Sequence, residues 1–71
     1  MSDYVAIYEK TSTGYSAYVP DLPGCISTGA TLPETKRNMK EAILGHLSVM
    51  REFGDPIPQP TTVAEHIQIS A

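Results

Sequence analysis

Three short segments in the first half of the chain carry the pattern of β-strands. Residues 4–8 are rich in aromatic and β-branched side chains, and residues 15–19 alternate larger side chains with smaller or polar ones. Residues 25–29 form a third, shorter segment of the same kind. A polar stretch that ends in Gly14 separates the first two segments, as is typical of a hairpin. Short connections between neighbouring strands predict an antiparallel meander.

The clearest periodic pattern follows Thr31 and predicts a helix. Its apolar side chains recur mostly every four residues, and the charged residues fall largely on the other side. These apolar residues are Leu32, Met39, Ile43, Leu47 and Met50. We expect Thr31 as the N-cap, Glu34 as its capping-box partner and Gly54 as a left-handed residue just after the helix. A single apolar stripe predicts that the helix covers one face of the sheet.

The rest of the chain predicts a spacer and a final strand. Residues 55–60 hold three alternating prolines, which favour an extended, polyproline-like conformation. In residues 61–70 the apolar Val63, Ile67 and Ile69 share one side, which predicts a strand; Glu65 interrupts that side and places the early part at a sheet edge. The order is therefore βββαβ. We expect one α+β domain over residues 1–71, a single helix packed on a small antiparallel-meander sheet.

A stiff connection joins the second and third predicted strands. Pro20 and Pro23 lack a backbone N–H and cannot sit inside a central β-ladder. Asp21 can hydrogen-bond the backbone two residues further on, and Gly24 can adopt a positive φ. The connection is therefore expected to be exposed and rigid, and to carry one carboxylate.

The length and the single cysteine point to a partner. A chain of 71 residues buries only about 60% of its unfolded surface, so its core is marginal. Cys25 is the only cysteine, which excludes an intrachain disulfide and fits a reducing compartment. His46 and His66 lie far apart in sequence, which disfavours a structural zinc site. We therefore expect a homo-oligomer or a bound partner, and neither a metal nor another cofactor.

The charge and the hydropathy pattern limit the class of partner. The net charge of −3 disfavours direct DNA or RNA binding, because phosphate contacts need clustered lysine and arginine, and it suits a basic protein instead. No stretch approaches the roughly 18 apolar residues of a membrane span. No charged and apolar leader is present either, so the default expectation is a cytoplasmic protein without a membrane contact.

Candidate catalytic groups are scattered. Asp21 and Glu34 are the carboxylates nearest the stiff connection, but acid–base or metal chemistry needs two such groups held close together, and no paired spacing is present. Cys25 could act as a nucleophile with His46 or His66 as base, but no oxyanion motif or orienting acid accompanies them. The expectation is a non-enzymatic protein without catalytic residues; a metal-dependent nuclease or hydrolase that uses Asp21 is the alternative.

The tyrosines suggest a contact surface. They all fall in the first two predicted strands, as Tyr4, Tyr8, Tyr15 and Tyr18. Tyrosine is enriched at protein interfaces, and aromatic side chains on a sheet can also stack RNA bases. Lys10 is the only basic residue before the helix, so core packing and protein contact are favoured over an RNA-binding module. Free strand edges would also suit a homodimer or strand addition to a partner.

A joint motif resembles a known family. Residues 15–25 read Y-S-A-Y-V-P-D-L-P-G-C, a capped helix follows, and residues 54–60 read G-D-P-I-P-Q-P. Together these resemble the HicB-like antitoxins of bacteria and archaea, over about residues 4–69. The resemblance implies a partial ribonuclease-H-like βββαβ fold without the catalytic carboxylate set.

The resemblance also implies a role. A HicB-like antitoxin of a type II toxin–antitoxin pair would bind and neutralise a small basic HicA-type toxin, an mRNA-cleaving ribonuclease, and would form dimers or tetramers. Many members carry a further C-terminal DNA-binding domain; the chain ends at Ala71, so we expect a short form without it. An orphan relative with no toxin partner is the alternative. The candidate partner-binding residues are Tyr15, Tyr18, Asp21, Leu22, Pro23 and Gly24.

Overall fold

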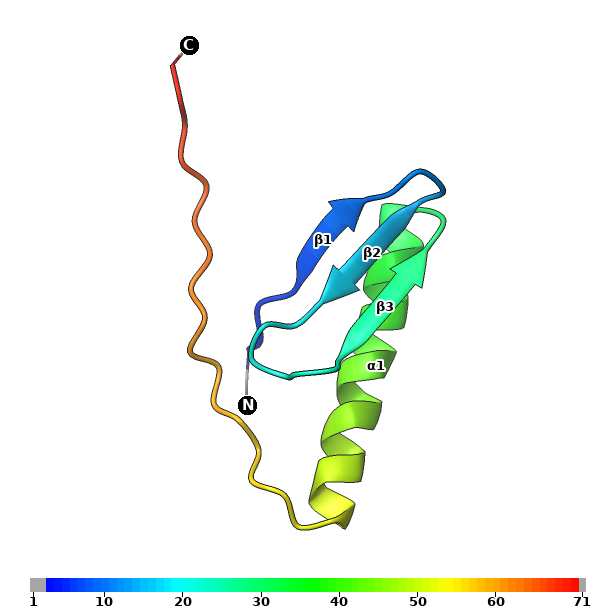
Figure 1. The fold of residues 1–71 in the computed structure, drawn as a ribbon, viewed down its shortest axis with the longest axis vertical. Coiled ribbons are helices and arrows are strands. Elements are labelled where there is room, and N and C mark those ends of the chain that lie inside the picture. Colours follow the sequence, from blue (N-terminus) through cyan, green and yellow to red (C-terminus); the bar gives the residue numbers. More distant parts are fainter. Residues whose placement is uncertain (1–2, 71) are drawn as a thin grey trace.

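A three-stranded antiparallel sheet and one long helix make up the folded part of the chain. The computed structural model describes residues 3–70. Its elements are β1 (Ile7–Lys10), β2 (Tyr15–Tyr18), β3 (Ile26–Gly29) and α1 (Leu32–Glu52), and the strand order is β1-β2-β3 (Figure 1). The predicted α+β class and the antiparallel meander are confirmed.

The first strand begins later than the sequence predicts. β1 starts opposite the end of β2, where Ile7 pairs with Tyr18. Val19, which follows Tyr18, donates its N–H to the carbonyl of Cys25 at 3.2 Å, on the side of β3. The next residue, Pro20, has no N–H to offer to β1. Residues 4–6 therefore have no ladder partner on β2. At its other end β1 continues to Lys10, because Thr11 donates its N–H to the Gly14 carbonyl and closes a short hairpin loop.

Both ends of α1 have defined caps. The Thr31 hydroxyl accepts the N–H of Glu34, and the Glu34 carboxylate in turn accepts the N–H of Ala30 at 2.8 Å. At the other end, Gly54 has a φ of 71° and donates its N–H to the Arg51 carbonyl, while Asp55 donates to the Met50 carbonyl. These two hydrogen bonds form a Schellman motif, which ends the helix at Glu52.

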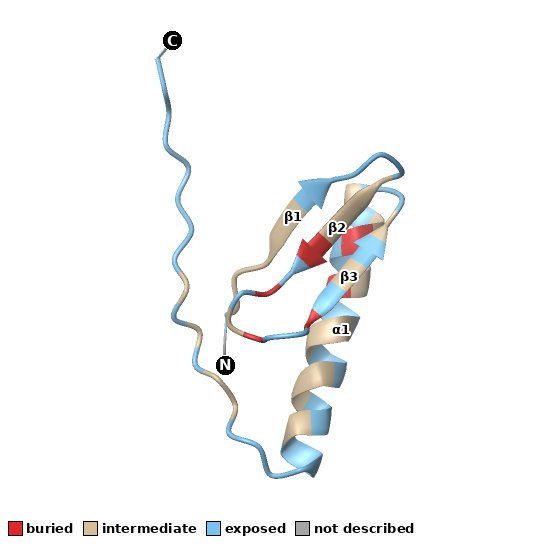
Figure 2. Cartoon of the chain, viewed as in Figure 1, coloured by how far each residue is buried: buried red, intermediate tan, exposed pale blue. Residues whose placement is uncertain are grey.

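The core lies between α1 and one face of the sheet. Its buried apolar residues are Ala17, Val19, Leu22, Cys25 and Met39. They come from β2, the β2–β3 connection and the first half of α1, as the red segments in Figure 2 show. Thr35 is also buried, and its hydroxyl donates to the Thr31 carbonyl at 2.7 Å. The Asn38 side chain donates to the Thr28 carbonyl at 2.8 Å and fixes the helix against β3.

The predicted fourth strand is not formed, which corrects that part of the βββαβ order. Within the described residues, positions 61–70 carry no strand pairing and run as extended chain away from the sheet (Figure 1). The radius of gyration is 13.8 Å, compared with roughly 11 Å for a compact domain of this length. A strand needs a hydrogen-bonding neighbour, and this segment meets none in its own sheet.

Candidate binding surface

An apolar row crosses the sheet face that α1 leaves uncovered. Ala17 and Val19 point toward the helix, so Tyr18 between them points to the opposite, open face. The pairing register places Ile7 and Ile26 directly opposite Tyr18 on the two neighbouring strands. Side chains opposite each other on paired strands share a face. Ile7, Tyr18 and Ile26 therefore form one row, in which Ile26 is 69% exposed.

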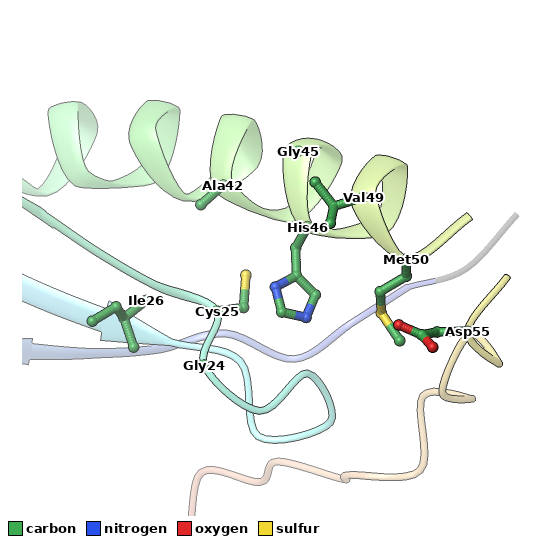
Figure 3. A pocket seen from close by; sticks show the side chains of 9 residues that line it. All are labelled: Gly24, Cys25, Ile26, Ala42, Gly45, His46, Val49, Met50 and Asp55. Atoms are coloured by element: carbon green, nitrogen blue, oxygen red, sulfur yellow. The ribbon is translucent and has the colours of Figure 1, made fainter. Parts of the chain in front are cut away.

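A mostly apolar groove adjoins this row beside β3. It has a volume of about 620 Å³ and lies between the start of β3 and the second half of α1 (Figure 3). It is lined by Gly24, Cys25, Ile26, Ala42, Gly45, His46, Val49, Met50 and Asp55. Ile26 belongs to both the row and the groove. We call Tyr18, Pro23, Gly24, Ile26 and Val49 the β3-side surface; all five are exposed.

The stiff connection contributes unequally to this surface. Pro23 and Gly24 are exposed, and Gly24 has a φ of 83°, which a residue with a Cβ adopts only with strain. Leu22 is 0% exposed, so its predicted partner contact is corrected: its side chain is part of the core. Its N–H donates to the Val19 carbonyl, and its carbonyl accepts the N–H of Cys25. These two turns direct Leu22 inward.

The two tyrosines predicted to bind a partner lie on opposite faces. Tyr15 pairs with Gly29 on the helix side of the sheet and is half-buried. It lines a second, more polar cavity with Glu34, at the end of the sheet near the helix start. Tyr18 lies on the open face. Gly24 lines the groove together with Ile26, the residue that pairs with Tyr18, whereas Tyr15 lies on the helix side of the sheet.

Asp21 holds the segment that follows the prolines. Its carboxylate accepts two hydrogen bonds from the N–H and hydroxyl of Thr61, both at 3.1 Å. It accepts two more from Thr62, at 3.0 Å from the N–H and 2.8 Å from the hydroxyl. The sequence suggested that Asp21 bonds its own turn, but four donors 40 and 41 positions away along the chain take that place. Two adjacent threonines after a proline spacer are the only sequence signal for this contact.

The Asp21 contact should depend on pH. The N–H and then the hydroxyl of Thr62, followed by the Thr61 groups, lower the pKa of the Asp21 carboxyl below its ordinary value of 3.8. A pKa lowered in the folded state means that the stabilisation is complete above 3.8 and is lost as pH falls through the folded-state pKa. We expect the amide NMR shifts of Thr61 and Thr62 to move together below pH 4.

The matched variant for this titration is Asp21→Asn. It keeps the shape of the side chain but has no carboxylate to titrate, so the Thr61 and Thr62 amide shifts should stay constant over the same pH range. Equal titration curves in the parent chain and the variant would show that Asp21 does not hold the segment.

The structure brings one predicted pair of reactive groups into the same groove. Cys25 and His46 both line it, as Figure 3 shows, whereas His66 lies in the extended segment. Cys25 is buried, and burial raises the pKa of its thiol, which disfavours the thiolate that a nucleophile requires. Among residues 3–70, no group of three histidine, cysteine or acidic side chains is placed to hold a metal ion. No helix in that part of the chain is long and apolar enough to cross a bilayer.

Family comparison places the chain. The family described as "HicB_like antitoxin of bacterial toxin-antitoxin system" matches residues 4–70. The chain belongs to the HicB-like antitoxin family. One relative, the UPF0150 protein Ta0767 of Thermoplasma acidophilum, is 36% identical over 69 residues, which are 96% of this chain and 97% of the relative. A 14.9 kDa protein from the rep-hol intergenic region of Haemophilus phage HP1 is 41% identical over 64 residues. This chain spans about half the length of that phage protein, with 90% of the chain matching 48% of it.

A solved structure shares the HicB-like fold. A chain of the "HicA3 and HicB3 toxin-antitoxin complex" superposes with a TM-score of 0.74 at 32% identity, over 84% of this chain and 70% of that chain. The sequence family and the fold therefore agree.

Proposed function

We propose that this HicB-like chain neutralises a HicA-type, mRNA-cleaving toxin by direct contact and without catalysis of its own. The observation that carries the proposal is the match to a chain of the HicA3–HicB3 complex, combined with family membership over residues 4–70. Because the toxin's target is mRNA, the contact would take place in the cytoplasm.

The β3-side surface has the properties that such a contact needs. Tyr18 and Ile26 offer adjacent apolar area on a flat sheet face, and the groove beside Val49 can receive a protruding side chain. Pro23 and Gly24 form a rigid rim, so little conformational entropy is lost when they bind. The net charge of −3 favours encounter with a basic toxin.

The candidate catalytic side chains have structural partners instead. The Glu34 carboxylate accepts the N–H of Ala30, and the Asp21 carboxylate accepts four hydrogen bonds from Thr61 and Thr62. The Cys25 thiol is buried in the core. A binding role uses the exposed apolar residues and leaves these groups to the fold.

Ile26→Lys is the variant that tests this surface. It places a positive charge on an apolar contact that would face a basic toxin, so we expect toxin affinity to fall about tenfold or more. The measurement is calorimetric binding to the HicA-type protein encoded beside this chain, together with protection of an mRNA substrate. Leu44→Lys is the matched control, because Leu44 is 59% exposed, against 69% for Ile26, and does not line the groove.

Three results would count against the proposal. They are an active HicA-type toxin that a stoichiometric amount of this chain does not inhibit, the absence of any HicA-type protein beside it, and equal loss of affinity in the two lysine variants. The first two would argue for an orphan relative, and the third would place the contact elsewhere on the chain.

A further inference from the structure

The groove beside β3 is apolar over most of its length and acidic at one end. Its apolar side chains are those of Ile26, Ala42, Val49 and Met50. Among the described residues that line the groove, Asp55 is the only acidic one. Figure 3 shows Asp55 at the same end of the groove as Met50. A side chain that fills this groove should therefore have a long apolar part and a polar group at its tip.

The place of Asp55 is set by the way α1 ends. Its N–H donates to the Met50 carbonyl at 2.8 Å as part of the Schellman motif, and Gly54 before it has a φ of 71°. This hydrogen bond holds the backbone of Asp55 beside the last turn of the helix, and the residue itself is exposed. A carboxylate on a fixed stretch of backbone loses less conformational entropy when a partner binds it.

The electrostatics at this end of the groove favour a cation. α1 ends at Glu52, and the last carbonyls of a helix carry a partial negative charge. Asp55 adds a full negative charge next to them. Arg51 also lies in the last turn of α1, but it does not line the groove. The acidic end of the groove therefore suits an ammonium or a guanidinium group.

Gly45 leaves the helix side of the groove bare. A glycine inside a helix is less stable than alanine by about 1 kcal/mol. The fold does not require it, because a Cβ built at Gly45 has no atom of the described residues within 4 Å. The backbone of a partner can therefore come close to α1 at this position. From Gly45 to Glu52 the helix rises by about 10 Å, which a long side chain and one hydrogen bond together can span.

We propose that the groove receives a lysine or arginine side chain of the HicA-type toxin. The aliphatic stem lies along Val49 and Met50, and the charged head bonds the Asp55 carboxylate. The toxin backbone crosses α1 at Gly45. A basic side chain matches both the apolar length and the acidic end, and Ile26 connects the groove to the rest of the β3-side surface. This inference rests on the proposed function and adds to it the kind of toxin residue that the groove recognises.

Asp55→Asn tests the acidic end. It keeps the size of the side chain and the backbone hydrogen bond to Met50 but removes the charge. We therefore expect the calorimetric affinity for the HicA-type protein encoded beside this chain to fall about tenfold. Glu52→Gln is the matched control, because it removes the same charge from an exposed residue that does not line the groove, and it should change the affinity by less than about threefold. Equal affinities for the parent chain and Asp55→Asn would overturn the inference, and so would an equal loss in the two variants.

Gly45→Leu tests the bare helix side. Leucine is a better helix former than glycine, so the thermal stability should be kept or increased, while the filled groove should lower the toxin affinity about tenfold or more. Ser48→Leu is the matched control, since Ser48 is an exposed residue of α1 that does not line the groove. Its affinity should stay close to that of the parent chain. A Gly45→Leu chain that binds the toxin as tightly as the parent chain would contradict the inference.

A double-mutant cycle identifies the toxin side chain. Each lysine and each arginine of the toxin is replaced by methionine in turn. At one position the loss of affinity should match that of Asp55→Asn, and the two changes together should add little to either alone. Additive losses at every toxin position would count against the inference. A parent chain that does not bind the toxin would overturn the proposed function and this inference with it, whereas a parent chain that binds it no better than Asp55→Asn and Gly45→Leu would overturn this inference alone.

Discussion

Leu22→Ala should destabilise the domain by about 2–5 kcal/mol. Leu22 is fully buried among Val19, Cys25 and Met39, so truncation leaves a cavity that the surrounding residues cannot fill without moving. Domains of ordinary size are stable by only about 5–15 kcal/mol, and a chain of 71 residues belongs at the low end. A large fraction of the variant should therefore be unfolded at 25 °C.

The measurement is urea unfolding followed by circular dichroism, at one fixed protein concentration for all variants. Leu44→Ala is the matched control, since it removes the same atoms from an exposed helix position and should change stability by less than about 0.5 kcal/mol. Equal midpoints for the two variants would mean that Leu22 is not a core residue, and that the stiff connection is not anchored in the way described.

Gly29→Ala should cost about 1–3 kcal/mol, the range found when a packed site is overfilled. A Cβ at Gly29 would lie 2.5 Å from the Thr35 hydroxyl oxygen and 2.8 Å from the Thr35 backbone nitrogen. Thr35 cannot retreat easily, because it is buried and its hydroxyl is bonded to the Thr31 carbonyl. The first turn of α1 would have to move away from β3.

Gly45→Ala is the control for this substitution. It adds the same methyl group in the middle of α1, where nothing lies within 4 Å of the new atom. Alanine is a better helix former than glycine, so we expect a gain of about 1 kcal/mol. Thermal unfolding of the two variants should thus move in opposite directions. A shift of the same sign in both would show that α1 does not approach β3 as closely at Gly29 as the structure indicates.

The helix could be predicted well because its signals are local. The Thr31 and Glu34 cap, the four-residue spacing of the apolar side chains and Gly54 each act within a few positions of the chain. The meander could be predicted for a similar reason, since each strand pairs with its neighbour in sequence.

The start of β1 could not be predicted from β-propensity, because it depends on whether β2 offers a pairing partner. Residues 4–6 have strong β-formers, yet β1 starts at Ile7, because the chain beyond Val19 turns toward Cys25 and offers no partner. The prediction of a final strand in residues 61–70 was wrong for a related reason. The spacing of Val63, Ile67 and Ile69 is that of a strand with one apolar side. Such spacing does not indicate whether a neighbouring strand is available to pair with it.

The candidate surface was predictable in part. The prolines and Gly24 marked an exposed, rigid connection, and Pro23 and Gly24 are exposed in it. The inward turn of Leu22 came from two backbone hydrogen bonds that no residue type encodes. The link from Asp21 to Thr61 and Thr62 spans about 40 positions, so it could not be found from spacing.

Elements that pack together in this fold lie close together in sequence, which should make the domain fold quickly. Every packed pair of elements is adjacent in sequence or nearly so: β1 with β2, β2 with β3, and α1 with β3 and β2. Short loops of this kind close quickly, and domains built from local contacts fold fast. Residues 63–70 contribute nothing to the core, so a newly made chain can complete its sheet and helix alone, at a rate that does not depend on concentration.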